Sequence, residues 1–169
     1  MSSARTAYTS LITSTAELHQ LDPNLFEALV LTESAGRADA FRFEPQFAQR
    51  YKIAEKYPQW PVRSVAASYG LTQVMCSTAY ELGWRDACPE YLFIPEVNLY
   101  WGGLYLHECL TWAAGFKTPD PDTLRGALCA YNGGRNSHTS PLNPHPSNIA
   151  YAAKVLSLVQ DLASVLHNP

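Results

Sequence analysis

The 169-residue sequence lacks any apolar run near the roughly 18 residues that a membrane-spanning helix needs. It also lacks a basic cluster, since 12 lysines and arginines stand against 15 aspartates and glutamates, for a formal net charge of -3. A protein that follows nucleic-acid phosphates is therefore not expected. Residues 1–6 lack the charged and apolar regions of a secretory signal. We expect a chain that stays where it is made, leaves by another route, or is a processed domain.

Metal-binding patterns are missing as well. The four cysteines, Cys76, Cys88, Cys109 and Cys129, form no CxxC pair, and the five histidines show no spacing typical of a metal site or a catalytic triad. We therefore expect no metal and no cofactor. An even number of cysteines permits disulfides without indicating a pairing, while the apolar helical surroundings of Cys109 and Cys129 favour small buried thiols.

The composition, 47% apolar and 16% charged, predicts one globular domain over residues 1–169. Alternating strand patterns are scarce, and only residues 69–75 are suited to brief pairing. The sequence therefore predicts an all-α fold with little or no β-structure. Helices are expected over residues 6–20, 22–36, 45–56, 77–82, 95–115, 121–131 and 146–166, with a long exposed loop at 136–146.

Glu33 lies on the apolar stripe of the second expected helix. Asp22 is placed as the N-cap and Pro23 as the first helical residue. Phe26, Leu29, Val30 and Glu33 then follow at positions i, i+3, i+4 and i+7, which share one helix face. A carboxyl group among apolar neighbours loses hydration, and its pKa rises toward that of a proton donor at neutral pH. The alternative is a buried acid that pairs with an arginine or with backbone N–H groups.

Four motifs occur in an order that resembles the soluble lytic transglycosylases, relatives of goose-type lysozyme. They are Glu33-Ser34, the stretch from Arg63-Ser64 to Gly70-Leu71-Thr72-Gln73-Val74-Met75, Ala130-Tyr131-Asn132-Gly133-Gly134, and Tyr151 with Val155. The segment 95–106 also looks like the Asn-containing helix of this family. The resemblance covers about residues 7–160 and implies a lysozyme-like helical domain with a substrate cleft.

The resemblance implies a role for each motif residue. Glu33 would be the general acid and base that cleaves the MurNAc-β-1,4-GlcNAc bond of peptidoglycan and yields 1,6-anhydromuramoyl products. Tyr131 would orient Glu33 through its phenol. The expected substrate-binding residues are Ser64, Gln73, Met75, Tyr131, Asn132 and Tyr151.

Structural roles remain open for most of these residues. Ser64 is also suited to capping a turn, and Asn132 to ending a helix. Gln73, Tyr131 and Tyr151 are equally compatible with buried core positions. Four other acids, Glu27, Glu55, Glu81 and Glu108, are expected on solvated helix faces.

Residues 37–60 depart from the family pattern, which often has only a short link between the first two motifs. This insertion contains Glu44, eleven residues after Glu33. Glu44 is a possible second carboxylate, which would position a water molecule if it faced Glu33 at roughly 6.5–9.5 Å, as in inverting glycosidases. A surface ion pair with Arg42 or Arg50 is the alternative.

Three functions therefore stay open: a lytic transglycosylase, a hydrolytic muramidase (endolysin) or chitinase using Glu33 plus Glu44, and a noncatalytic peptidoglycan-binding protein. The expected partner is the glycan strand of peptidoglycan, and the expected protein is a monomer. Action on the bacterial cell wall, in the periplasm or outside the cell, follows from the resemblance. Without a signal peptide in this chain, a phage-encoded enzyme released through a holin or a trimmed domain is expected.

Overall fold

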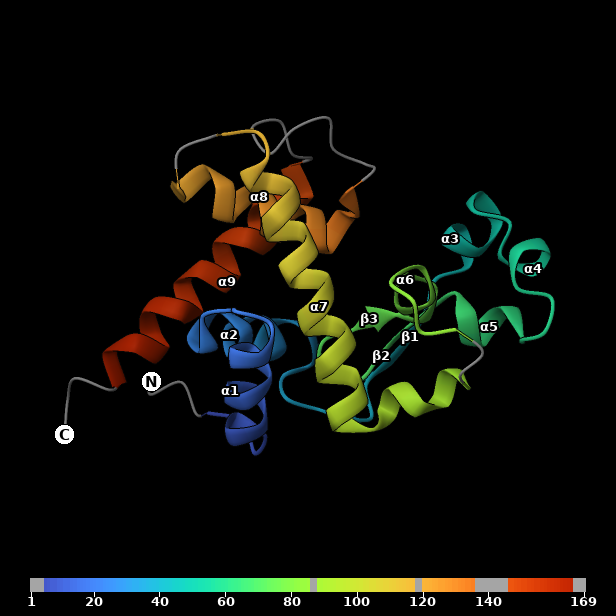
Figure 1. The fold of residues 1–169 in the computed structure, drawn as a ribbon, viewed down its shortest axis with the longest axis horizontal. Coiled ribbons are helices and arrows are strands. Elements are labelled where there is room, and N and C mark those ends of the chain that lie inside the picture. Colours follow the sequence, from blue (N-terminus) through green and yellow to red (C-terminus); the bar gives the residue numbers. More distant parts are fainter. Residues whose placement is uncertain (1–4, 86–87, 118–119, 136–145, 166–169) are drawn as a thin grey trace.

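A computed structural model describes residues 5–85, 88–117, 120–135 and 146–165 (Figure 1). The expected loop at 136–146 lies, except for Pro146, outside the described residues. Five helices form a helical part: α1 (Thr9–Leu18), α2 (Pro23–Ser34), α7 (Pro95–Ala114), α8 (Asp120–Gly133) and α9 (Pro146–Val165). A smaller part contains β1 (Phe41–Phe43), α3 (Pro45–Arg50), α4 (Ile53–Lys56), α5 (Val62–Val65), β2 (Ala67–Tyr69), β3 (Val74–Met75), α6 (Cys76–Glu81) and the 3-10 helix η1 (Pro89–Phe93).

The described chain is mostly helical, as the sequence predicts. Asp22 caps α2 by accepting a hydrogen bond from the Leu25 N–H at 2.8 Å, and Pro23 is its first residue. The helix ends where Ala35 takes the left-handed conformation, with φ 54°. Both ends of the helix that carries Glu33 are thus fixed by local backbone chemistry.

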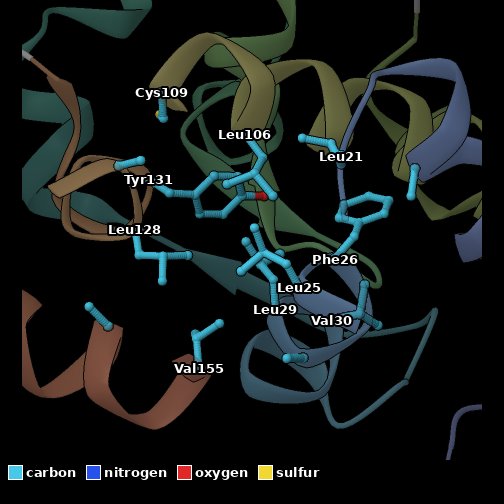
Figure 2. Close-up of a cluster of buried hydrophobic side chains, with 14 of the residues drawn as sticks. Leu21, Leu25, Phe26, Leu29, Val30, Leu106, Cys109, Leu128, Tyr131 and Val155 are labelled. Carbon is cyan, nitrogen blue, oxygen red and sulfur yellow. The ribbon is translucent and has the colours of Figure 1, made fainter. Parts of the chain in front are cut away.

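The core of the helical part lies between α2, α7, α8 and α9. Figure 2 shows Phe26 and Leu29 of α2 pointing toward Leu106 of α7 and Leu128 of α8. All four of these side chains are fully buried. Such packing holds α2 rigidly, because close-packed interiors resist small displacements. Within the described residues, no helix is long and apolar enough to cross a membrane.

The smaller part contains a three-stranded antiparallel sheet in the order β1-β2-β3. The pairing of Tyr69 with Val74 falls in the region 69–75 where brief strand pairing is predicted, whereas Ser68 and all of β1 lie outside it. The helix expected over 45–56 is divided into α3 and α4, because Lys52 takes a left-handed conformation with φ 49°. The segment 37–60 therefore supplies one strand and two short helices.

Glu27 is buried, so the expectation that it lies on a solvated helix face is wrong. Only 1% of the residue is exposed. Its carboxylate accepts hydrogen bonds from the Arg5 guanidinium at 2.6 Å and the Thr6 N–H at 3.0 Å, and another from the Thr9 hydroxyl. The ion pair offsets the free-energy cost of removing the Glu27 carboxylate from water, and it links the N-terminal segment to α2. The side chains of Glu55, Glu81 and Glu108 are at least 40% exposed, as expected.

Candidate active site

Glu33 lines a cavity of about 360 Å³ between the helical part and the sheet. The same cavity is lined by five other residues from the predicted site: Glu44, Gln73, Met75, Tyr131 and Asn132. Ser64 and Tyr151, which the sequence also predicts, lie outside the described lining of this cavity. The structure thus brings together most, but not all, of the candidate residues.

Ser34 explains how Glu33 is placed at the cavity. Glu33 lies in the last turn of α2, and the next residue, Ser34, is buried. The Ser34 hydroxyl contacts the carbonyl oxygens of Val30 at 3.1 Å and Leu71 at 2.8 Å. The end of α2 is therefore tied directly to the Gly70-Leu71-Thr72-Gln73 loop, so the first two sequence motifs form one structural unit.

Asn98 of α7 holds the other side of this loop. Its side chain is fully buried and accepts hydrogen bonds from the Thr72 N–H at 2.9 Å and the Thr72 hydroxyl at 2.8 Å. Its amide donates to the carbonyl oxygens of Tyr69 at 2.7 Å and Leu92 at 2.9 Å. A fully satisfied buried network of this kind makes the loop rigid.

Gly102 allows the loop to approach α7. A Cβ at this position would lie 2.2 Å from the Thr72 hydroxyl oxygen, which is closer than atoms can pack. This close approach explains a glycine inside α7, where glycine costs a helix roughly 1 kcal/mol relative to alanine.

Tyr151, and not Tyr131, makes the contact with Glu33 that the sequence predicts for Tyr131. The Tyr131 hydroxyl donates to the Thr72 carbonyl oxygen at 2.9 Å, so it supports the loop rather than Glu33. The Tyr151 hydroxyl donates to Glu33 Oε1 at 2.6 Å instead. Burial raises the pKa of each phenol well above its usual value, and the charge of Glu33 adds to this effect, so both hydroxyls keep their protons.

The environment of Glu33 favours a proton donor. Burial raises the pKa of its carboxyl to about 6, while the hydrogen bond from Tyr151 and the positive charges of Arg42 and Lys154 partly oppose that rise. Desolvation therefore dominates the balance. A carboxyl with this pKa is present in both protonation states near neutral pH, as a general acid and base requires.

The sheet forms the wall opposite Glu33. Arg42 of β1 is paired with Ser68 of β2, and Ser68 with Met75 of β3, so the three side chains lie in one row on the same face. All three line the cavity. Glu44 follows two residues after Arg42, and its carboxylate pairs with the Arg42 Nε at 2.5 Å. The ion pair expected as the alternative for Glu44 is therefore present, within the same cavity as Glu33.

Ser68, rather than Ser64, is the serine in this cavity. The Ser64 hydroxyl donates to Glu90 at 3.3 Å, away from Glu33. Motif spacing in the sequence does not predict Ser68 as a site residue. The register of β2 against β1 and β3 places Ser68 on this face, and a strand of three residues is too short to show a readable alternation in the sequence.

Gln73 has a structural contact in addition to its place in the cavity. Its backbone is left-handed, with φ 49°, and its side-chain amide donates to the carbonyl oxygens of Ala40 at 3.2 Å and Gly70 at 3.1 Å. These bonds join the loop to β1. Across the described residues, no cluster of three or more histidines, cysteines, aspartates or glutamates is arranged to hold a metal ion, and none of the four cysteines forms a disulfide.

The chain matches one family model and is similar in fold to a solved structure. The family model described as Transglycosylase SLT domain matches residues 10–154. A solved structure of an inactive mutant of the lytic transglycosylase Slt from Pseudomonas aeruginosa is similar with a TM-score of 0.65 and 21% sequence identity. The match covers 96% of this chain but only 25% of that one, and at this identity it shows a shared fold. No curated protein matches the chain.

Proposed function

Because the chain belongs to the family of transglycosylase SLT domains, we propose that it is a peptidoglycan lytic transglycosylase with Glu33 as its general acid and base. The observation that carries this proposal is the carboxyl of Glu33, which lines a cavity, has a pKa raised to about 6 by burial, and accepts a hydrogen bond from Tyr151. The proposed substrate is the MurNAc-β-1,4-GlcNAc bond of the bacterial cell wall.

The proposed reaction needs one carboxyl group. Protonated Glu33 donates its proton to the glycosidic oxygen while the bond from that oxygen to C1 of the muramoyl sugar breaks. The transition state has oxocarbenium character, and ionised Glu33 then takes the proton from the muramoyl 6-hydroxyl. The 6-oxygen bonds to C1, which closes the 1,6-anhydro ring. The proton gained and the proton lost by Glu33 balance, and water is not consumed.

The state of Glu44 supports this mechanism over hydrolysis. A second carboxylate that activates water must be available to accept a proton. Glu44 instead forms an ion pair with Arg42, and its side chain is only 33% exposed. The ion pair occupies the Oε1 oxygen of the Glu44 carboxylate. Glu44 therefore serves in our proposal to hold Arg42 at the cavity wall.

Hydrolysis by a muramidase remains the second candidate, because Glu44 lines the same cavity as Glu33. Mass spectrometry of purified peptidoglycan digested with the protein separates the two. We expect muropeptides with 1,6-anhydromuramoyl ends from the wild type, and none from Glu33→Gln. The matched control Glu17→Gln changes an exposed acid of α1 and should leave the products unchanged.

A second variant tests Glu44 itself. Glu44→Gln should keep the anhydro products and lose less than tenfold in rate, since its carboxylate takes no proton in the proposed reaction. Reducing muramoyl ends from the wild type, lost in Glu44→Gln, would establish the hydrolase. A wild type that binds peptidoglycan and releases nothing soluble would establish the noncatalytic binding protein.

A further inference from the structure

The charges around the Glu33 cavity do not balance. The charged residues in its described lining are Glu33, Arg42, Glu44 and Arg50. The Glu44 carboxylate pairs with Arg42, whereas Arg50, an exposed residue at the end of α3, has no ion-pair partner within the described part of the chain. With Glu33 protonated, the lining therefore carries one net positive charge, in a protein whose formal net charge is -3.

Arg42 uses only part of its guanidinium for this ion pair. Its Nε lies 2.5 Å from Glu44 Oε1, which fixes one edge of the planar group. A guanidinium has five N–H donors, so the four on the two Nη atoms remain for a ligand. The charge of Arg42 also lowers the pKa of Glu33, so the guanidinium acts on the same space as the acid. Arg42 is therefore a partly held donor at the cavity wall.

Ser68 adds a neutral donor beside Arg42. The two residues are partners in the register of β1 and β2, so their side chains are neighbours on one face of the sheet. Only 3% of Ser68 is exposed, and the residue lines the cavity. Its hydroxyl makes no hydrogen bond to the part of the chain that the structure describes. A ligand in the cavity that accepts a hydrogen bond would give this hydroxyl a partner.

A carboxylate fits this set of donors. Guanidinium groups bind planar carboxylates through paired, charge-assisted hydrogen bonds, and a hydroxyl can donate one more. The muramoyl sugar carries a lactyl group on its 3-oxygen, and that group ends in a free carboxylate when no peptide stem is attached. At about 360 Å³ the cavity lies at the small end of the ~300–1,000 Å³ range of ligand pockets. It therefore suits an anion bonded close to the sugar ring better than the distant carboxylates of a stem.

We propose that Arg42, Arg50 and Ser68 bind the lactyl carboxylate of a muramoyl residue that has lost its peptide stem, so that the enzyme prefers stem-free strands. The inference rests on the proposed function, since it takes the muramoyl sugar to lie beside Glu33. The segment 37–60, which departs from the family pattern, supplies both arginines. Hydrolysis of the amide bond between the lactyl group and the stem is the class of reaction that must supply this substrate.

The test compares two pools of strands that differ in one chemical group. An amidase removes the stems from purified peptidoglycan, and in half of the product the lactyl carboxylates are coupled to methylamine with a carbodiimide, which gives neutral methylamides. Calorimetry measures the binding of both pools to Glu33→Gln, whose side chain is neutral like the protonated acid. Arg50→Gln, Arg50→Lys and Arg85→Gln are then added to this parent. Arg85 is exposed and outside the described lining of the cavity, so it provides the matched control.

We expect the parent to bind the carboxylate pool about tenfold more tightly than the methylamide pool. The preference should shrink as salt is added, because salt screens exposed charges. Arg50→Gln should remove most of the preference, Arg50→Lys should keep much of it because the charge is kept, and Arg85→Gln should resemble the parent. A variant that folds poorly would instead bind both pools more weakly and leave their ratio unchanged.

Two results would overturn the inference. The parent could bind both pools equally, or strands that keep their stems could bind more tightly than the carboxylate pool in a way that Arg50→Gln abolishes, which would assign Arg50 to a carboxylate of the stem. Neither result affects the proposed function, which depends on the release of anhydromuropeptides by the wild type. Absence of that release, with the carboxylate preference intact, would remove the proposed function and leave the anion site.

Discussion

The hydroxyl of Tyr151 donates a hydrogen bond to Glu33 Oε1 at 2.6 Å, although 118 positions separate the two residues in the sequence. The contact exists because α9, which carries Tyr151, packs against α2, which carries Glu33 (Figure 1). It orients the carboxyl and also opposes the rise in pKa that burial causes. The pKa of Glu33 therefore depends on two opposing effects, burial and the hydrogen bond from Tyr151, and burial has the larger effect.

Removing this hydrogen bond should shift the pH profile of the enzyme. In Tyr151→Phe the pKa of Glu33 should rise further above about 6, because a contact that lowers it is lost. The limb of the kcat/KM profile on which activity falls with rising pH should therefore move to higher pH. Loss of one hydrogen bond to a charged group should also reduce kcat/KM by about tenfold. Tyr91→Phe is the control, and a limb that stays in place or moves to lower pH would contradict the assignment.

Glu33→Gln should stabilise the protein at neutral pH. The ordinary pKa of a glutamate carboxyl is 4.5, and burial raises the pKa of Glu33 to about 6 in the folded state, so the folded state binds the proton more tightly. The protonated Glu33 carboxyl therefore makes its full contribution to the free energy of unfolding below pH 4.5. That contribution is lost as the pH rises through about 6.

The difference in pKa corresponds to about 2 kcal/mol. Urea denaturation should show Glu33→Gln to be more stable than the wild type by up to that amount at pH 7.5, and equally stable at pH 4. Glu17→Gln, an exposed change on α1, should show neither effect. A variant that is less stable than the wild type at pH 7.5 would mean that the Glu33 carboxylate is well solvated or paired.

Asn98→Ala should destabilise the Gly70-Leu71-Thr72-Gln73 loop beside the cavity. The substitution leaves the backbone groups of Thr72, Tyr69 and Leu92 without their buried partner. We expect a loss of about 3 kcal/mol in the free energy of unfolding, measured with urea, together with a loss of activity. Asn132→Ala, at an exposed position, should stay within about 0.5 kcal/mol of the wild type. Equal stability of the two variants would refute the role of Asn98.

The parts of the fold that sequence predicts best are those with local causes. The Asp22 cap, Pro23 and the apolar stripe define α2 without reference to the rest of the chain, and α2 begins where they indicate. Pro95 likewise begins α7. Phe26, Leu29 and Val30, which share the helical face of Glu33, are fully buried, and Glu33 lines the cavity at the end of that face.

The parts that sequence predicts poorly depend on distant contacts. Strand β1 has only three residues, and it forms because residues 67–69 of β2 pair with it. The burial of Glu27 depends on Arg5, which lies 22 positions away. No local sequence pattern predicts Ser68 or Tyr151 as a site residue. The register of the strands places Ser68 in the cavity, and the packing of α9 against α2 places Tyr151 next to Glu33.

The proposed mechanism requires that burial raises the pKa of the Glu33 carboxyl. Titration of the Glu33 side-chain carbon by ¹³C NMR, assigned by its absence from the spectrum of Glu33→Gln, measures that quantity in the wild type. We expect a midpoint of about 6. A midpoint at or below 4.5, the ordinary pKa of a glutamate carboxyl, would show a hydrated or paired carboxylate and would contradict the role of Glu33 as the acid.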